Sequence, residues 1–402
     1  MGDDAGPMSH SPSSPLQQLP TPDADALAAS SQLVARIQSE IAARDGWISF
    51  ADYMQLALYA PGLGYYTGGA AKFGPGGDFV TAPSLGPLFA QAIVRQVAEV
   101  IERSAPRILE FGAGGGELAG DLLAELSQMG CAVESYSILE PGAELKARQQ
   151  AAIAKRAAGS TTRVEWLDRL PEEFSGVMIA NEVADAMPVH ALAWRAEGIF
   201  ERGVSAGNGQ LAWAERPAAG EVLEAAQAMD IGPPYASEIA LAARAWMGTI
   251  AGSLGQGALL VIDYGFPARE FYHPQRDTGT LMAHYRHHAH ADPFFHPGLQ
   301  DLTTHVDFSA LAASAEGAGL RVLGYTTQSR FLVNCGITDV LERTDAADAR
   351  RYAPLAAMAQ TLLSPAEMGE LFKVLCVGRG VDRGLGRGGL VGFARGDRSH
   401  TL

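Results

Sequence analysis

Cysteine is scarce in this chain of 402 residues, which contains only Cys131, Cys335 and Cys376. The three lie far apart, so no two of them have the short spacing of a zinc-binding pair. Isolated cysteines also do not form the disulfide framework of a small secreted domain. We therefore expect a reducing compartment and no cysteine-based metal site.

Basic residues are outnumbered, with 30 lysines and arginines against 45 aspartates and glutamates, and the formal net charge is −15. Such a surface repels nucleic acid and anionic membranes, so neither is expected as a partner, whereas a basic protein segment would suit it. No apolar run approaches the length of a membrane span. The composition, 47% hydrophobic and 19% charged, is that of a globular protein.

The segment 1–30 lacks basic residues and is rich in Pro, Ser, Asp and Ala, which is typical of a disordered tail. The first arginine is Arg36, and four aspartates precede it. This charge is opposite to that of a mitochondrial transit peptide or a secretory signal. We therefore expect a cytoplasmic protein.

Glycine recurs at every second position after one apolar run. The run ends with Glu110 and one further residue, and Gly112, Gly114 and Gly116 follow before a helical pattern over 118–129. Alternate glycines let the backbone turn sharply and lie close to a ligand where a Cβ would clash. The spacing indicates a nucleotide-type binding loop, and an ordinary tight turn is the alternative.

The residue after the last glycine distinguishes two nucleotide sites. A dinucleotide site favours glycine three positions after the second one, because pyrophosphate sits on the helix N-terminus. Glu117 occupies that position here, and its carboxylate would face the phosphate oxygens. S-adenosylmethionine has no phosphate and carries cationic groups that nearby acids favour. The loop therefore indicates S-adenosylmethionine, and an NAD oxidoreductase is the weaker alternative.

Three further acids are candidates for cofactor binding. Glu140 ends the next expected strand, over 133–140, where an acid can accept both ribose hydroxyls; a helix-start role is the alternative. Asp168 follows the expected strand 163–167 and could accept from the adenine amine, or cap a turn. Asp78 lies in a glycine-rich loop and could reach the cofactor or the target, or serve as an ordinary turn residue.

Strand and helix patterns alternate after the glycine loop. Short apolar runs such as 176–180 and 257–263 suit the middle of a parallel sheet that is covered on both faces. Further strands are expected over 320–325 and 371–378. The order predicts an α/β fold with a doubly wound, mostly parallel sheet and ligands at the carboxyl ends of its strands.

The same patterns divide the chain into the tail (1–30), an N-terminal helical region (31–105) and an α/β domain (106–402). Two excursions, near 191–253 and 264–307, exceed ordinary connection lengths. Long excursions from such a sheet are usually lids or substrate-binding elements. We therefore expect inserted substrate-binding elements in both places.

Motifs spread along the chain resemble the MidA-like methyltransferases, a family that includes the mitochondrial complex I assembly-factor methyltransferase. They keep their order and comprise Phe50–Met54, Leu63–Tyr66, Gly77–Pro83, Glu110–Gly116, Asn181–Val189, Ile262–Gly265, His305–Phe308 and Phe372–Leu375. The resemblance implies a class I methyltransferase fold, S-adenosylmethionine as donor and, for the mitochondrial members, symmetric dimethylation of an arginine on a complex I subunit. Ser84 and Gln91 depart from acids common in relatives, which bears on target and loop chemistry.

An acidic turn follows the expected strand 176–180. It carries Asn181, Glu182 and Asp185 at the carboxyl end of a central strand. If the target is a guanidinium, two carboxylates can clamp it and help to remove its proton. We therefore assign catalysis to these three residues; helix capping by the same residues is the alternative. Tyr264, after another strand, lines the target channel or packs.

Histidines concentrate in the second excursion. They are His284, His287, His288, His290, His296 and His305. No cysteine accompanies them and no neat paired spacing occurs, so no metal is expected and they are interpreted as surface or substrate-loop residues.

Together these features predict an S-adenosylmethionine-dependent methyltransferase with a protein substrate. The resemblance implies that the methylated residue is an arginine in a subunit of the complex I type. A small-molecule methyltransferase and a non-catalytic assembly factor that keeps the fold are the alternatives. The sequence is compatible with a monomer and with a homodimer.

Overall fold

A large mostly parallel sheet forms the centre of the protein. In the computed structural model, which describes residues 19–68, 81–140, 142–382 and 389–402, eight strands make this sheet, seven of them in the order β14-β15-β9-β4-β1-β2-β3. β15 is antiparallel to β9 and β14, and the other neighbours on this path are parallel. The order reverses at β1, so the predicted doubly wound sheet is confirmed. The strands are β1 (Arg107–Phe111), β2 (Ser135–Leu139), β3 (Arg163–Leu167), β4 (Phe174–Asn181), β9 (Leu254–Phe266), β14 (Arg321–Thr327) and β15 (Phe372–Arg379), with β13 (Val306–Asp307) paired to β9.

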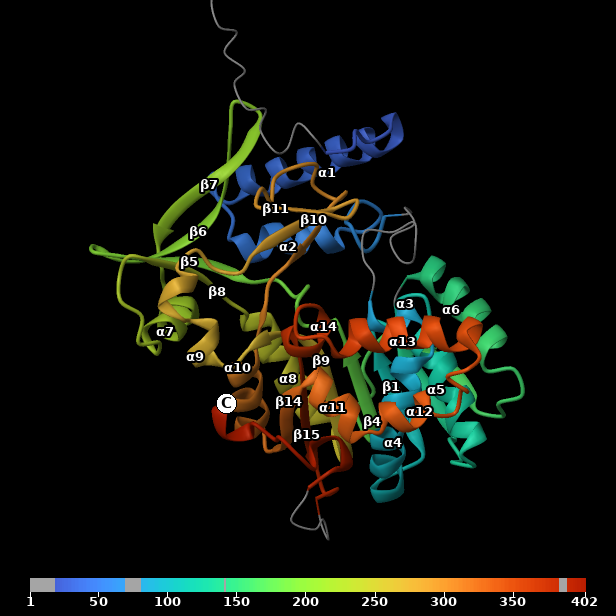
Figure 1. Ribbon diagram of the computed structural model, residues 1–402. Coiled ribbons are helices and arrows are strands. Elements are labelled where there is room, and N and C mark those ends of the chain that lie inside the picture. The colour runs from blue at the N-terminus through green and yellow to red at the C-terminus, as the bar shows by residue number, and fades with distance from the viewer. Residues whose placement is uncertain (1–18, 69–80, 141, 383–388) are drawn as a thin grey trace, which may run out of the picture.

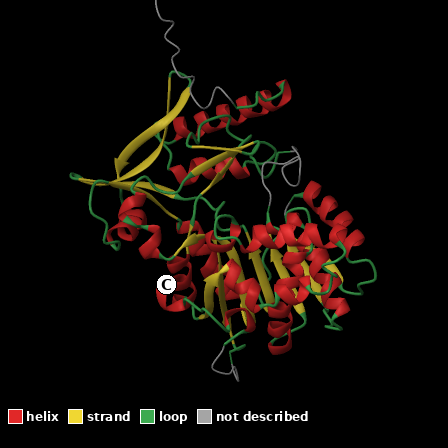
Figure 2. Ribbon diagram, in the orientation of Figure 1, coloured by secondary structure: helices red, strands yellow, loops and turns green. Residues whose placement is uncertain are grey.

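Helices cover both faces of this sheet (Figures 1 and 2). Alternate residues of β9 enter the two cores: Ala258 and Leu260 face one, Leu259 and Val261 the other. This double burial explains the charge-free run in the sequence. The helices are α4 (Leu88–Arg103), α5 (Glu117–Gln128), α6 (Ala143–Arg156), α11 (Gln328–Asn334), α12 (Ile337–Leu341) and α13 (Ala349–Leu363) for the first core, and α8 (Leu241–Ser253) and α10 (Phe308–Gly317) for the second.

A second lobe lies over the carboxyl ends of the strands (Figure 1). Two sheets, β7-β6-β5-β8 and β11-β10-β12, pack with the N-terminal helices around separate apolar clusters. Its elements are α1 (Ala24–Ala43), α2 (Phe50–Tyr59), β5 (His190–Arg195), β6 (Gly198–Gly207), β7 (Gln210–Pro217), α7 (Gly220–Gln227), β8 (Tyr235–Ile239), β10 (Met282–Tyr285), β11 (His288–His290) and β12 (Asp301–Thr303).

Short helices complete the chain. They are α3 (Ala82–Leu85), α9 (Ala268–Phe271) and α14 (Met368–Leu371), with 3-10 turns at Pro274–Arg276, Val391–Phe393 and Ser399–Thr401. Among the described helices, none combines the length and the apolar character needed to cross a bilayer.

The predicted boundary of the tail at residue 30 is wrong for residues 24–30, which belong to α1. The Asp23 carboxylate accepts from the backbone N–H of Ala26 at 2.8 Å and starts the helix there. Residues 24–30 are mostly alanine, which favours helix, and the helix continues into Leu33, Ile37 and Ile41, which are buried in the lobe.

The predicted regions also divide differently in space. Within 31–105, α1 and α2 belong to the second lobe, whereas α4 packs on the large sheet. Within 191–253, β5–β8 form the lobe, but α8 packs on the large sheet. The segment 264–307 supplies β10–β12 to the lobe and β13 to the large sheet. The chain therefore crosses between lobes several times, and the cavity described below lies where it does so.

A substitution at Gly257 tests whether the close approach of β4 and β9 requires glycine. Its φ is +151°, and an added Cβ would overlap the carbonyl oxygen of Gly176. We expect Gly257→Ala to lower the free energy of unfolding by about 2 kcal/mol more than Gly198→Ala. Gly198 is the matched control, because its φ is +139° but no atom lies within 4 Å of an added Cβ. Urea unfolding of both variants makes the comparison, and equal losses would contradict the steric explanation.

Candidate active site

A buried carboxylate shapes the turn that follows β4. Asp263, near the end of β9, is 0% exposed. Its Oδ2 accepts from the backbone N–H groups of Val183, Ala184 and Asp185 at 3.2, 2.9 and 3.3 Å. Burial and the neighbouring carboxylates of Asp185 and Glu182 raise the pKa of Asp263, while these N–H groups favour the ionised form. Asp263 thus fixes the acidic turn from the adjacent strand.

Glu182 occupies that turn in a left-handed backbone conformation, with φ of 54°. This conformation costs a non-glycine residue about 1–2 kcal/mol and is held in place by the surrounding structure. Its Oε1 accepts from Asn181 Nδ2 at 3.0 Å and from the backbone N–H of Ala82 at 3.4 Å. Burial, then repulsion from Asp185, raises the pKa of Glu182 to about 8.

The structure separates the two predicted carboxylates. Glu182 lines the large cavity described below, and Asp185 does not. Asp185 is 5% exposed, and its Oδ2 accepts from the Tyr264 hydroxyl at 2.7 Å. Burial raises its pKa. The prediction that both acids clamp the target is corrected for Asp185, which lies behind Tyr264 and accepts a hydrogen bond from that phenol.

The glycine loop has the conformation that its spacing predicts. Gly112, Gly114 and Gly116 all have positive φ, at 60°, 52° and 89°. An added Cβ would lie 3.3 Å from Val183 at Gly112 and 2.9 Å from Gln149 Cα at Gly116, but would meet no atom within 4 Å at Gly114. The loop is packed at both ends and open in the middle, and its first glycine contacts the acidic turn.

Gln149 on α6 joins the parts of the cofactor side, and the sequence analysis did not identify it. Its side chain is fully buried. Nε2 donates to the Gly114 carbonyl at 3.1 Å and to Glu140 Oε2 at 3.3 Å, while Oε1 accepts from Trp166 Nε1 at 2.8 Å. A buried amide inside an amphipathic helix carries no sequence signal by itself, because its partners come from three other segments.

Glu140 lies at the end of β2, as predicted. Its Oε1 accepts from the backbone N–H of Gly142 at 2.8 Å. Burial raises its pKa, and the Gly142 and Gln149 hydrogen bonds oppose this. Each carboxylate oxygen keeps a further lone pair for a ligand hydroxyl.

Glu110 lies beneath the glycine loop rather than at its surface. Its side chain is 2% exposed and accepts from the Tyr136 hydroxyl at 2.8 Å. Burial raises the pKa of Glu110 to about 7, with Glu117 adding repulsion. Glu110 therefore supports the loop through the β1–β2 pairing.

One predicted cofactor residue, Asp168, is not brought to this site. Asp168 is 80% exposed and forms an ion pair with Lys146 at 2.6 Å, which lowers its pKa. Its placement favours the alternative of a surface turn residue over an adenine contact. Asp78 lies outside the described residues.

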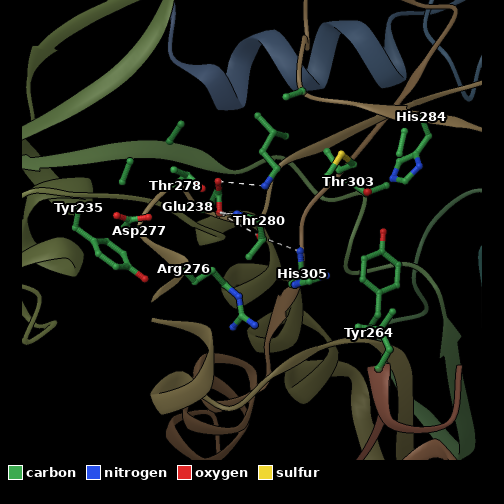
Figure 3. A pocket seen from close by; sticks show the side chains of 18 of the residues that line it. Tyr235, Glu238, Tyr264, Arg276, Asp277, Thr278, Thr280, His284, Thr303 and His305 are labelled. Carbon is green, nitrogen blue, oxygen red and sulfur yellow. Dashed lines mark hydrogen bonds between the residues drawn. The ribbon is translucent and has the colours of Figure 1, made fainter. Parts of the chain in front are cut away.

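A cavity of about 1260 Å³ lies between the two lobes (Figure 3). The large sheet contributes Glu182, Tyr264 and Phe372 to its wall, and the second lobe contributes Trp213 and Tyr235, among others. Figure 3 shows Tyr264, His305 and Arg276 along one side and Glu238 opposite. The Glu238 carboxylate accepts from Thr280 and Leu281 and so anchors the connecting segment.

The histidines divide between the cavity and the surface. His284 and His305 line the cavity. The His305 ring meets Tyr264 edge-on at 5.4 Å, and burial, with Arg276 and Lys373, lowers its pKa to about 4. In the described part of the chain, no group of three or more metal-binding side chains comes together.

The cofactor side fits S-adenosylmethionine. The space above Gly114 is open, Glu140 can accept from ribose hydroxyls, and the acidic surroundings of Glu110, Glu117 and Glu182 suit sulfonium and ammonium groups. These residues meet the acidic turn at Val183, so the donor and the cavity converge at Glu182.

Comparisons with known proteins agree with this site. Residues 88–326 match the family described as S-adenosyl-L-methionine-dependent methyltransferases. A mouse protein named protein arginine methyltransferase NDUFAF7, mitochondrial, is 30% identical over 81% of this chain and 80% of its own length. A zebrafish protein of the same name is 27% identical over 83% of each chain.

A solved structure is similar over nearly the whole chain. It is a protein from Burkholderia thailandensis crystallised with S-adenosyl-homocysteine, 51% identical, with a TM-score of 0.91 and coverage of 96% of this chain and 100% of that one. S-adenosyl-homocysteine is the product left when S-adenosylmethionine gives up its methyl group, so the neighbour supports the donor expected from the glycine loop. The glycine loop, the acidic turn and these similarities place the chain in the family of S-adenosylmethionine-dependent methyltransferases.

Proposed function

We propose that this methyltransferase modifies arginine side chains of protein. The observation that carries the proposal is the set of acceptor atoms around the acidic turn that receive no donor. Among the described residues, the buried Asn181 Oδ1 accepts no hydrogen bond, and Glu182, which lines the cavity, is bonded only at Oε1. Buried acceptors without partners cost about 1–3 kcal/mol each. A guanidinium, with five N–H donors and no acceptor, satisfies such a site.

Glu182 would hold the target nitrogen and take up the released proton. When bound, S-adenosylmethionine supplies an electrophilic methyl group on its sulfonium. Methylation of a guanidinium cation at nitrogen releases one proton, because the product is again a singly charged guanidinium. The Glu182 carboxylate can accept that proton, and its hydrogen bond orients the attacking nitrogen. Tyr264, held by Asp185, forms the wall beside it.

The size of the cavity supports a protein target. A volume of about 1260 Å³ exceeds what a small metabolite fills. Its walls come from both lobes and include exposed apolar side chains, Met282 at 38% and Leu371 at 39%. An extended peptide segment would cover these side chains. The names of the mouse and zebrafish relatives point to the same substrate class.

We further propose that the target lies in a subunit of a respiratory complex I type enzyme. The support is the motif resemblance, and the acidic charge of −15 suits a basic protein segment. Incubation with methyl-labelled S-adenosylmethionine in lysate from cells lacking this gene should label one protein band that yields dimethylarginine on hydrolysis. Label confined to small solutes would instead indicate a metabolite enzyme, and no label despite tight donor binding a non-catalytic assembly factor.

Replacing Glu182 tests its role. We expect Glu182→Gln to lower kcat by about a hundredfold or more, because the amide cannot accept the proton. Calorimetric binding of S-adenosyl-homocysteine should change by no more than a few-fold. Glu134→Gln, which removes an exposed acid near Arg107 on β1, is the control and should keep full activity. Unchanged turnover in Glu182→Gln would contradict the role of Glu182 as proton acceptor.

The pH dependence follows from the raised pKa of Glu182. The acting form is the carboxylate, so kcat/KM should rise with pH and level off above about 8. A bound guanidinium favours the charged carboxylate, so the corresponding inflection in kcat should lie at lower pH. Initial rates across pH at low and saturating substrate measure both. An inflection that persists in Glu182→Gln would assign it to another group.

A further inference from the structure

Among the described residues, one arginine in the wall of the cavity, Arg276, has no acidic partner. Arg195, Arg202 and Arg276 all line the cavity. Arg195 donates to both carboxylate oxygens of Glu215 at 2.8 and 2.6 Å, and Arg202 lies 3.8 Å from the same carboxylate. Within the described ranges, Arg276 forms no ion pair, and its only hydrogen bond is to the Glu270 carbonyl. Its charge is therefore available to a ligand.

The Arg276 side chain is held in a fixed orientation. Its guanidinium lies over the Phe266 ring, with Cζ 4.1 Å from the ring centroid, and Nη1 donates to the Glu270 carbonyl. Stacking on an aromatic face leaves the in-plane N–H groups available for a bidentate partner. An arginine ordered in this way loses less side-chain entropy on binding than a free one.

A continuous wall joins Arg276 to the acidic turn. Phe266 meets His305 edge-on at 5.1 Å, and His305 meets Tyr264 at 5.4 Å. Tyr264 then donates to Asp185. Figure 3 shows Arg276, His305 and Tyr264 along the same side of the cavity. Arg276 and Glu182 therefore present opposite charges to one bound segment.

The surroundings of Arg276 are cationic on one side and acidic on the other. Lys373 Nζ lies 5.1 Å from the centroid of the same Phe266 ring. Burial lowers the pKa of His305, and the positive charges of Arg276 and Lys373 lower it further. Asp277, the next residue in the chain, also lines the cavity. The His305 Nδ1 atom is buried and has no hydrogen-bond partner among the residues that the structure describes. A carboxylate placed here could accept from the remaining N–H groups of Arg276 and, in the tautomer that carries the proton on Nδ1, from His305.

We propose that Arg276 binds the carboxylate of an aspartate or glutamate that lies near the target arginine in the protein substrate. This inference rests on the proposed function. The cavity would then select by charge at two points: the turn at Glu182 takes the cation, and Arg276 takes the anion. Opposite charges at the two points fix the direction in which the segment lies, which a uniformly acidic groove could not do.

Binding of synthetic peptides tests the subsite without relying on turnover. Each peptide carries a single arginine and one aspartate at successive positions on either side, and matched peptides carry asparagine, lysine or phosphoserine instead. Fluorescence anisotropy with the S-adenosyl-homocysteine-loaded protein measures affinity. At one spacing we expect aspartate to bind about tenfold more tightly than asparagine, and lysine to bind more weakly. Equal affinity at every spacing, or no binding by any peptide, would overturn the subsite.

Variants assign the preference to Arg276. Arg276→Gln should abolish the preference for aspartate but keep the affinity for the asparagine peptide, and Arg276→Glu should favour the lysine peptide. Arg269→Gln, at an exposed neighbouring position, is the matched control and should keep the preference. If Arg276→Gln does not fold, the lysine and asparagine peptides on the wild-type protein still decide. A preference for phosphoserine over aspartate would assign the site to a phosphorylated substrate and overturn the carboxylate proposal.

Turnover on the same peptides separates this inference from the proposed function. Methylation of the arginine together with the aspartate preference supports both. The aspartate preference without methylation of any arginine would leave the subsite standing and contradict arginine transfer. Methylation of the arginine without any preference for aspartate would support arginine transfer and contradict the subsite.

Discussion

The site depends on the carboxylate of Asp263, which is buried and does not line the cavity. Burial removes all water from the Asp263 carboxylate. Hydrogen bonds from the backbone N–H groups of the turn after β4 compensate for this lost hydration. Without it, three N–H groups in the interior would lack acceptors, which is costly. The same bonds force the turn to leave β4 sharply, and this places Glu182 in its left-handed conformation. The strain at Glu182 is thus stabilised from the neighbouring strand.

The turn also joins two halves of the molecule that carry different tasks. On one side Val183 contacts Gly112, and Gln149 ties the glycine loop to Glu140, so the donor site is a rigid unit. On the other side the Tyr59 hydroxyl donates to the Ala186 carbonyl at 3.0 Å, which fastens the second lobe to the turn. The turn is therefore in contact with both the glycine loop and the second lobe.

Sequence patterns predicted the parts of this arrangement that are local. The glycine spacing and the apolar strands reflect backbone geometry and burial within short segments, so both were recognisable. The role of Asp185 was not, because its position behind Tyr264 depends on the pairing of β4 with β9. Asp168 follows a strand, as a cofactor-binding acid would, yet its side chain is exposed and forms an ion pair with Lys146. Arg276 ends a short 3-10 turn, and its contact with the Phe266 ring on β9 depends on the fold rather than on a local sequence pattern.

The electrostatics of the turn explain why a cation is the fitting target. Asp185 raises the pKa of Glu182, and both of these carboxylates raise the pKa of Asp263, whose two oxygens accept from backbone N–H groups. A neutral ligand would leave this repulsion in place. A guanidinium relieves it, since its charge stabilises the ionised form of Glu182 while its N–H groups satisfy the open acceptors. In the proposed reaction, binding of the arginine would also generate the carboxylate that receives the proton, and it would thereby couple recognition of arginine to the chemistry at Glu182.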